Sequence, residues 1–224
     1  MAKLVALEGI DGTGKGTQSK RLVQRLSDSD LKVRLLSFPQ YDATQFGQAI
    51  GDFLNGRFGT LEQVHPFLAA VLYAGDRFES RGVLDKAREE ADVVVFDRFV
   101  ASNLAHQGSR LPLEQRADFV DRMRTIEHEV FGLPVADLTI LLDLPADEAR
   151  KLVAKKDARN YTDREADIQE EDTHYLTGVS EVYQSLATSD PAWRTVQCMN
   201  AGDLRTIEAI SDEVWQHVQA LLDQ

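Results

Sequence analysis

The chain has 224 residues, of which 43% are hydrophobic, and its formal net charge is −12 at pH 7. This length and apolar content suffice for one well-cored α/β domain, and no repeat, low-complexity tract or linker divides the sequence. The acidic balance argues against a general binder of nucleic acids or anionic membranes, because such proteins need a basic surface. The single cysteine, Cys198, excludes an internal disulfide framework, and its apolar surroundings predict a buried structural thiol.

The sequence carries no sign of export or membrane insertion. No basic leader precedes an apolar segment, and no apolar run has the length of a membrane span. We therefore expect a cytoplasmic protein that forms one domain over residues 1–224.

Five short apolar runs are typical of buried parallel strands. The helical patterns between them are long enough for right-handed crossovers, which predicts a Rossmann-like five-stranded parallel sheet flanked by helices. In such sheets, ligands bind beyond the carboxyl ends of the strands. The predicted strands are Lys3–Leu7, Val33–Phe38, Val93–Asp97, Leu138–Leu144 and Thr195–Cys198.

A glycine-rich turn follows the first predicted strand and precedes an amphipathic stretch from Gln18 to Leu26. This context predicts the phosphate-binding loop of a P-loop NTPase, in which backbone N–H groups surround an anion and a lysine follows the β- and γ-phosphates. The sequence therefore predicts binding of ATP or GTP. The loop consists of Gly9, Ile10, Asp11, Gly12, Thr13, Gly14, Lys15, Gly16 and Thr17.

The loop departs from the common pattern at Gly16, where a serine or threonine would ligate magnesium. Either the hydroxyl of Thr17 takes over this role, or water and phosphate hold the metal. Asp97, at the end of the third strand, is a second candidate for the metal shell, and Arg98 beside it can grip a phosphate. The alternative for Asp97 and Arg98 is a structural ion pair at the end of a strand.

A carboxylate inside a phosphate loop should be repelled by a bound triphosphate, so Asp11 needs a partner. The alternative is that Asp11 only stabilises the turn. Tyr73 and Arg77 lie four residues apart and would share one helix face, where they could stack on a pyrimidine and donate to its edge. Taken alone, such a pair is more often an aromatic residue of the core beside an arginine whose guanidinium extends into solvent.

The polar segment at 152–171 carries many charges, among them Arg159 and Arg164. Its charge pattern alone favours a solvated helix face. Its position after the fourth strand of a phosphate-loop protein instead suggests a mobile lid that closes over the nucleotide and excludes water.

Four blocks of this sequence resemble thymidylate kinase, and the resemblance covers essentially the whole chain. The blocks are Glu8–Lys15, the Phe38–Pro39 turn, Leu72–Arg77 and Asp97–Asn103. A phosphate loop alone spans a vast superfamily, and the stretch from Gly14 to Gln18 by itself is similar to adenylate kinase. The combination of Asp11 with the Asp97–Arg98–aromatic block and Ser102 separates thymidylate kinase from its relatives.

The resemblance implies transfer of the ATP γ-phosphoryl group to dTMP, with magnesium, in a homodimer. By this resemblance, Asp11 binds the 3′-hydroxyl of dTMP and Arg98 binds its phosphate. Tyr73 stacks on the base, and Arg77 donates a hydrogen bond to O4. The lid would supply Arg159 and Arg164, since the loop has no arginine, as in the lid-arginine type of the family. The implied dTMP-binding residues are Asp11, Phe38, Tyr41, Tyr73, Arg77, Arg98, Ser102, Asn103 and His106, the catalytic ones Lys15, Arg98, Arg159 and Arg164, and the metal-binding ones Thr17 and Asp97.

Two other functions stay open at this point. Another nucleoside monophosphate kinase, such as adenylate kinase, fits Gly16, Thr17 and Gln18, although the loop lacks the proline usual in that family and contains the acidic Asp11. A nucleotide-binding switch protein without phosphoryl transfer would leave Arg77 and Arg98 without a joint purpose.

Overall fold

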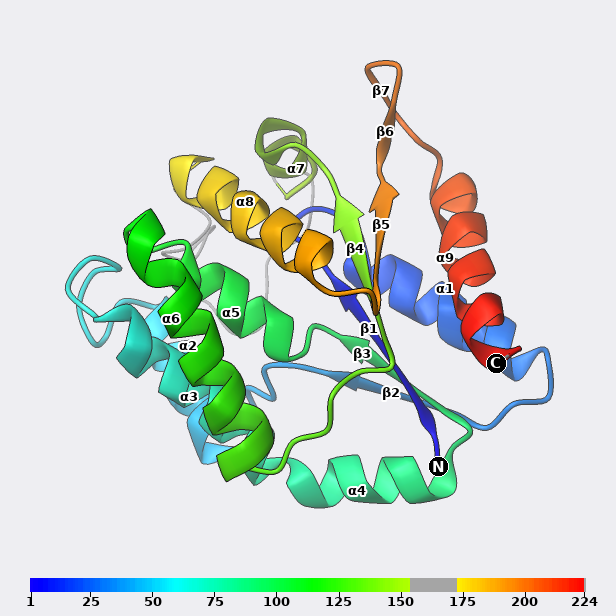
Figure 1. The fold of residues 1–224 in the computed structure, drawn as a ribbon, viewed down its shortest axis with the longest axis horizontal. Helices are drawn as coiled ribbons and strands as arrows, with labels where there is room; N and C mark the ends of the chain where they lie inside the picture. The colour runs from blue at the N-terminus through cyan, green and yellow to red at the C-terminus, as the bar shows by residue number, and fades with distance from the viewer. Residues whose placement is uncertain (154–172, 224) are drawn as a thin grey trace.

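The computed structural model describes residues 1–153 and 173–223. A five-stranded parallel sheet with the order β2-β3-β1-β4-β5 forms its centre (Figure 1). The predicted fold class is therefore confirmed. The elements are β1 (Lys3–Glu8), α1 (Lys15–Ser27), β2 (Val33–Ser37), α2 (Gln45–Leu54), α3 (Pro66–Glu79), α4 (Arg81–Glu90), β3 (Val93–Asp97), α5 (Val100–Gly108), α6 (Leu113–Arg124), π-helix η1 (Thr125–Val130), β4 (Leu138–Asp143), α7 (Ala146–Val153), α8 (Thr173–Ser189), β5 (Trp193–Gln197), β6 (Met199–Asn200), β7 (Asp203–Leu204) and α9 (Ile207–Leu222).

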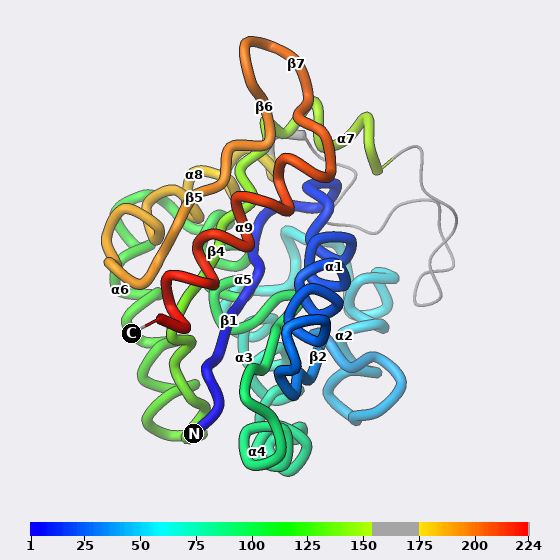
Figure 2. The backbone as a smooth tube through the Cα atoms, turned by 90° about the vertical axis from the view of Figure 1, so that its right-hand side faces the viewer, coloured from blue at the N-terminus to red at the C-terminus, as the bar shows by residue number. Residues whose placement is uncertain are grey.

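Helices cover both faces of the sheet. Helices α1 and α9 pack together on one face, in front of the strands in Figure 2. Helices α5 and α8 pack together on the other face, and α3 and α6 lie against α5. This arrangement follows from the strand sequences, since the central strands are buried on both sides and need apolar cover there.

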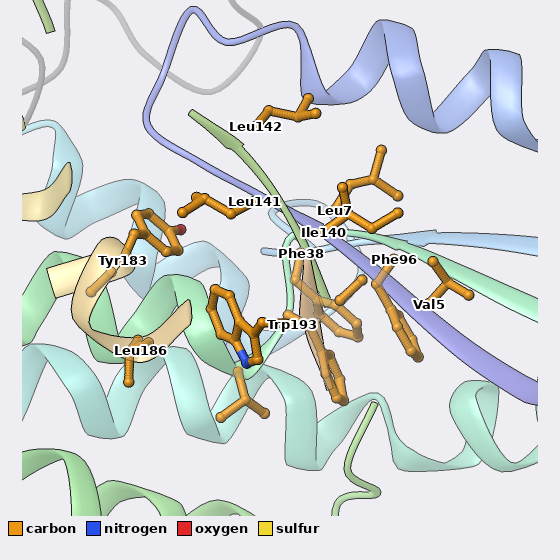
Figure 3. Packing of buried hydrophobic residues seen from close by; sticks show 14 of the residues in the cluster. Val5, Leu7, Phe38, Phe96, Ile140, Leu141, Leu142, Tyr183, Leu186 and Trp193 are labelled. Carbon is orange, nitrogen blue, oxygen red and sulfur yellow. The ribbon is translucent and has the colours of Figure 1, made fainter. Parts of the chain in front are cut away.

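The core consists of side chains from the central strands and the covering helices (Figure 3). Phe96 of β3 stacks on Phe99 with ring centroids 4.2 Å apart, and Phe38 lies against both rings. Tyr183 and Leu186 reach this core from α8. Cys198 is buried as predicted, and burial raises the pKa of its thiol to about 12.

Several predicted boundaries differ from those observed. Strand β2 ends at Ser37 and β4 at Asp143, because each approaches a proline, which cannot donate to a sheet ladder. Strand β5 begins at Trp193, which pairs with Thr139 of β4, and ends before Cys198.

Two further differences lie at the loop after β1 and beyond β5. Helix α1 begins at Lys15, three residues before the predicted stretch, because the phosphate loop leads directly into its first turn. The antiparallel hairpin of β6 and β7, which projects beyond the sheet at the top of Figures 1 and 2, was not predicted because its strands are only two residues long.

Within the described residues, no helix combines the length and apolar character needed to cross a bilayer. The segment predicted as a lid begins at 152, but residues 152 and 153 belong to the last turn of α7. The rest of that segment lies outside the described residues.

Candidate functional site

A cavity opens beyond the carboxyl ends of the central strands. All nine residues predicted to contact dTMP lie in its wall. They come from distant points of the chain: some follow strands β1, β2 and β3, and the others belong to helices α3 and α5. The lining residues are Asp11, Phe38, Pro39, Tyr41, Leu54, Tyr73, Arg77, Arg98, Phe99, Ser102, Asn103, His106 and Gln107.

The phosphate loop joins β1 to α1 beside this cavity. Gly12 has a φ of 92°, and a Cβ atom there would lie 2.2 Å from the carbonyl oxygen of Ala149 in α7. Gly14 has a φ of 87° and caps α1 in the left-handed conformation. Glycine is therefore required at Gly12 for close approach and favoured at Gly14 for backbone shape.

Lys15 is folded back onto the loop. Its Nζ donates to the carbonyl oxygens of Gly9 at 2.8 Å and Ile10 at 2.7 Å. Burial, with the positive charge of Arg98, lowers the pKa of Lys15 to about 7. A bound triphosphate would favour the charged form of Lys15, and its oxygens would compete with the two carbonyl oxygens for the Nζ hydrogens. Lys15 can therefore exchange these carbonyl partners for phosphate oxygens without leaving the loop.

Arg98 follows β3 and has a positive φ of 67°, an unfavourable conformation for a residue with a Cβ atom. This turn directs the guanidinium back over the phosphate loop, where Nη2 donates to Asp11 Oδ1 at 2.7 Å and Nη1 to Gly9 O at 3.3 Å. Burial opposes the charge, but Asp11, Tyr183 and Glu8 hold the pKa of Arg98 well above its ordinary value. Asp11 thus has the cationic partner that its place in the loop demands.

Arg77 is fully buried on α3 and forms two parallel hydrogen bonds with Glu127 of η1. The pair uses Nε and Nη2, and no described residue accepts from Nη1. Arg77 therefore reaches the cavity as a fixed donor. Glu127 was missed in the sequence, because it lies 50 residues from Arg77 in a helix with no motif.

Asn103 of α5 has a side-chain oxygen without a hydrogen-bond partner in the described part of the chain. Its Nδ2 donates to Ala70 O at 3.0 Å and Glu127 Oε1 at 2.9 Å, which fixes the amide orientation. Its Oδ1 is buried and accepts no hydrogen bond from the described residues. Gln107, one turn later, likewise has a buried Nε2 without a partner among them. Gln107 was missed, although its i,i+4 spacing from Asn103 was a usable signal.

His106 lies in the cavity wall between Arg98 and Tyr175. Its Nε2 is 3.3 Å from Arg98 Nη1, and its Nδ1 is 3.0 Å from the Tyr175 hydroxyl. Arginine can only donate, so Nε2 accepts and Nδ1 carries the proton. Burial and the charge of Arg98 lower the pKa of His106 to about 3, so the imidazole is neutral near pH 7.

The predicted metal-binding residues lie at the start of α1 and the end of β3. A Cβ atom at Gly16 would lie 3.1 Å from Asp97 Oδ2, so the Asp97 carboxylate faces the loop beside Lys15 and Thr17. The described residues contain no group of three or more His, Cys, Asp and Glu side chains that could hold a metal. This sparse set fits Mg²⁺ bound mainly by nucleotide phosphates and water. The predicted lid residues Arg159 and Arg164 lie outside the described residues.

A model of the family described as thymidylate kinase matches residues 7–204. The chain belongs to the thymidylate kinase family. It is 32% identical over 219 residues to the thymidylate kinase of Desulforudis audaxviator, covering 97% of this chain and 90% of the relative. It is 31% identical over 173 residues to the thymidylate kinase of Mycobacterium tuberculosis, covering 75% and 80% of the two chains.

The fold of the thymidylate kinase family is also found by comparison with solved structures. The thymidylate kinase of Candida albicans superposes with a TM-score of 0.74 at 21% identity, covering 98% of this chain and 92% of the other. This likeness supports the architecture, while the family assignment comes from the sequence matches.

Proposed function

We propose that the chain transfers the γ-phosphoryl group of ATP to dTMP, giving dTDP and ADP. The chain is an enzyme of the nucleoside monophosphate kinase class, because the thymidylate kinase match extends over most of its length. The observation that carries the choice of dTMP is that one cavity holds a hydrogen-bond donor, Arg77, beside Asn103, whose Oδ1 accepts no hydrogen bond from the described residues.

The base of dTMP complements these two groups. Thymine offers an acceptor at O4 beside a donor at N3, and Arg77 can only donate while Asn103 Oδ1 can only accept. Cytosine reverses both, and adenine also places an amino group beside a ring acceptor, so each would leave buried groups unpaired. Tyr73 stacks on the base, and Phe38 and Tyr41 complete its apolar walls.

The sugar and phosphate of dTMP fall near Asp11 and Arg98. We assign the 3′-hydroxyl to Asp11 and the acceptor phosphate to Arg98, with Ser102 and His106 beside the guanidinium. The Asp11–Arg98 contact joins the acceptor site to the phosphate loop of the donor. This placement brings the two phosphates together, which is the main requirement of phosphoryl transfer.

The donor ATP occupies the phosphate loop of residues 9–17, with Lys15 on its phosphates. Thr17 and Asp97 are the residues proposed to hold Mg²⁺, directly or through water. When bound with ATP, Mg²⁺ supplies neutralisation of charge on the phosphate oxygens. Lys15, Arg98 and a lid arginine, Arg159 or Arg164, supply the remaining positive charge, since the loop itself has no arginine. This makes the chain a lid-arginine enzyme with one domain and a lid near 152–171.

The expected assembly comes from the family resemblance, and the expected location comes from the sequence. A homodimer and a cytoplasmic location are the expected states, and sedimentation of the purified chain measures the first. Neither is needed for the assignment of the reaction.

A screen of nucleoside monophosphates for ADP production tests the proposal. The expected order of acceptors is dTMP first, dUMP weaker, and dCMP and AMP poor, because only the first two present the O4 and N3–H pattern. AMP as the best acceptor would assign the chain to adenylate kinase. ATP binding without acceptor-dependent ADP release would make it a switch protein.

A further inference from the structure

Glu8, the last residue of β1, is a fully buried carboxylate outside the cavity wall. A buried carboxylate is costly unless donors surround it. Glu8 has three: the Phe99 N–H at 2.7 Å on Oε1, and the hydroxyls of Ser102 at 2.6 Å and Tyr183 at 2.9 Å on Oε2. Such a complete set of donors indicates that the charge at this position has a purpose other than packing.

Ser102 connects Glu8 to Arg98. The Ser102 hydroxyl donates to Glu8, so its lone pairs are left for other partners, and Arg98 Nη1 donates to it at 3.0 Å. The Tyr183 hydroxyl, which donates its own hydrogen to Glu8, lies 2.9 Å from the same Ser102 oxygen, so three oxygen atoms form a triangle that contains two hydroxyl hydrogens. The direction in which Ser102 can accept from Arg98 is therefore fixed by two groups that do not reach the cavity.

Tyr183 belongs to α8, which packs against α5, β4 and β5. Figure 3 shows its ring reaching from α8 toward Leu141 in the sheet. The hydroxyl is buried, and burial with the charge of Glu8 raises its pKa well above the ordinary value, so it stays a donor at all working pH values. A phenylalanine would fill the same apolar space without this hydrogen bond.

We propose that Glu8 and Tyr183 are positioning residues that hold the Arg98 guanidinium, through Ser102, in the orientation that receives the acceptor phosphate. The inference rests on the proposed function, because it takes the Arg98 ligand to be the phosphate monoester of dTMP. Arg98 already bears an unfavourable backbone conformation, and two acceptors on the loop, Gly9 O and Asp11 Oδ1, also bind its guanidinium. Glu8 and Tyr183 hold the Ser102 oxygen in place, and this oxygen accepts from Arg98 Nη1, whereas Asp11 accepts from Nη2.

The test compares dTMP with thymidine, which lacks the phosphate. In Tyr183→Phe, the Kd for dTMP measured by calorimetry should rise about threefold to tenfold, because one hydrogen bond of the network is lost. The Kd for thymidine should stay within about twofold, since the base and sugar contacts do not involve Arg98 Nη1. The matched control is Leu186→Ala, which removes a buried apolar side chain from the same helix and the same core cluster but has no polar atom that could take part in the network. It should lower Tm and leave the ratio of the two Kd values unchanged.

A double-mutant cycle shows whether the effect passes through Arg98. In an Arg98→Met background, adding Tyr183→Phe should change the Kd for dTMP by less than about twofold. Glu8→Gln, which keeps one acceptor oxygen and turns the other into an amide N–H₂ that faces one or two of the three donors, should raise the Kd for dTMP more than Tyr183→Phe does if the variant folds. The proposal would be overturned if Tyr183→Phe weakened the binding of dTMP and of thymidine equally. It would also be overturned if Tyr183→Phe raised the Kd for dTMP as much in the Arg98→Met background as in the unmutated enzyme. Failure of the unmutated enzyme to bind dTMP would instead overturn the proposed function.

Discussion

The guanidinium of Arg77 and the carboxylate of Glu127 meet in two parallel hydrogen bonds of 2.6 Å, and both side chains are almost fully buried. Helix α3 supplies one partner and the π-helix η1 the other. The same Glu127 oxygen that binds Arg77 Nη2 also accepts from Asn103. One carboxylate therefore orients both groups that we assign to the thymine edge.

Glu127→Gln should destabilise the protein by about 3 kcal/mol, because it leaves the Arg77 charge buried without its counter-charge. The same variant should weaken the binding of dTMP more than the binding of ATP, because Arg77 and Asn103 both lose the carboxylate that orients them. Denaturant unfolding and calorimetric titration measure the two effects. Glu129→Gln, on the exposed side of the same helix, is the control and should change stability by less than about 0.5 kcal/mol. Unchanged dTMP binding in Glu127→Gln would remove Arg77 from base recognition.

Asp11→Asn should lower kcat/KM for dTMP by roughly tenfold or more while the affinity for ATP changes little. The substitution weakens the 2.7 Å contact with Arg98 and removes the charge proposed to bind the 3′-hydroxyl. A 3′-deoxy acceptor should already be poor with the unmutated enzyme and should lose little further activity in the variant. Steady-state kinetics with both acceptors provide the measurement. A parallel loss of ATP affinity would assign Asp11 to the architecture of the loop.

His106→Gln should make folding less sensitive to acid. Burial and Arg98 lower the pKa of His106 to about 3 from 6.5, so between these values the unfolded chain binds a proton that the folded chain does not. This difference lowers the stability of the unmutated protein as pH falls, by about 2 kcal/mol between pH 6.5 and pH 4.5. The variant lacks this contribution. Urea unfolding at the two pH values measures it, and identical losses for both proteins would contradict a neutral buried His106.

Arg159→Ala should lower kcat by on the order of a thousandfold with little change in the affinity for dTMP, because a phosphate-clamping arginine acts mainly in the transition state. Arg164→Ala is the second candidate. The control is Arg34→Ala, which removes an exposed arginine of β2 that pairs with Glu90 of α4. This variant should leave kcat unchanged. Near-normal kcat in both lid variants would refute the lid-arginine assignment.

The sequence alone determined the fold class and the phosphate loop, because both depend on local patterns. Apolar runs of strand length, separated by helical patterns, leave few topologies open. The loop from Gly9 to Thr17 is contiguous, so its backbone geometry is encoded in the order of its own residues. The residues predicted to bind dTMP come mostly from four separate blocks, and the structure brings them into the wall of one cavity.

Only the tertiary structure decided what each residue proposed to bind dTMP contacts. Arg77 looked like a single reader of the base, but Glu127 fixes it from 50 residues away. Asp11 needed a cation, and Arg98 supplies it from 87 residues away. Glu8, the first residue of the loop block, gave no sign that Tyr183, 175 residues later, would bond to it. Hydrogen bonds between distant segments depend on how the helices pack over the sheet, and no local pattern in the chain records that packing.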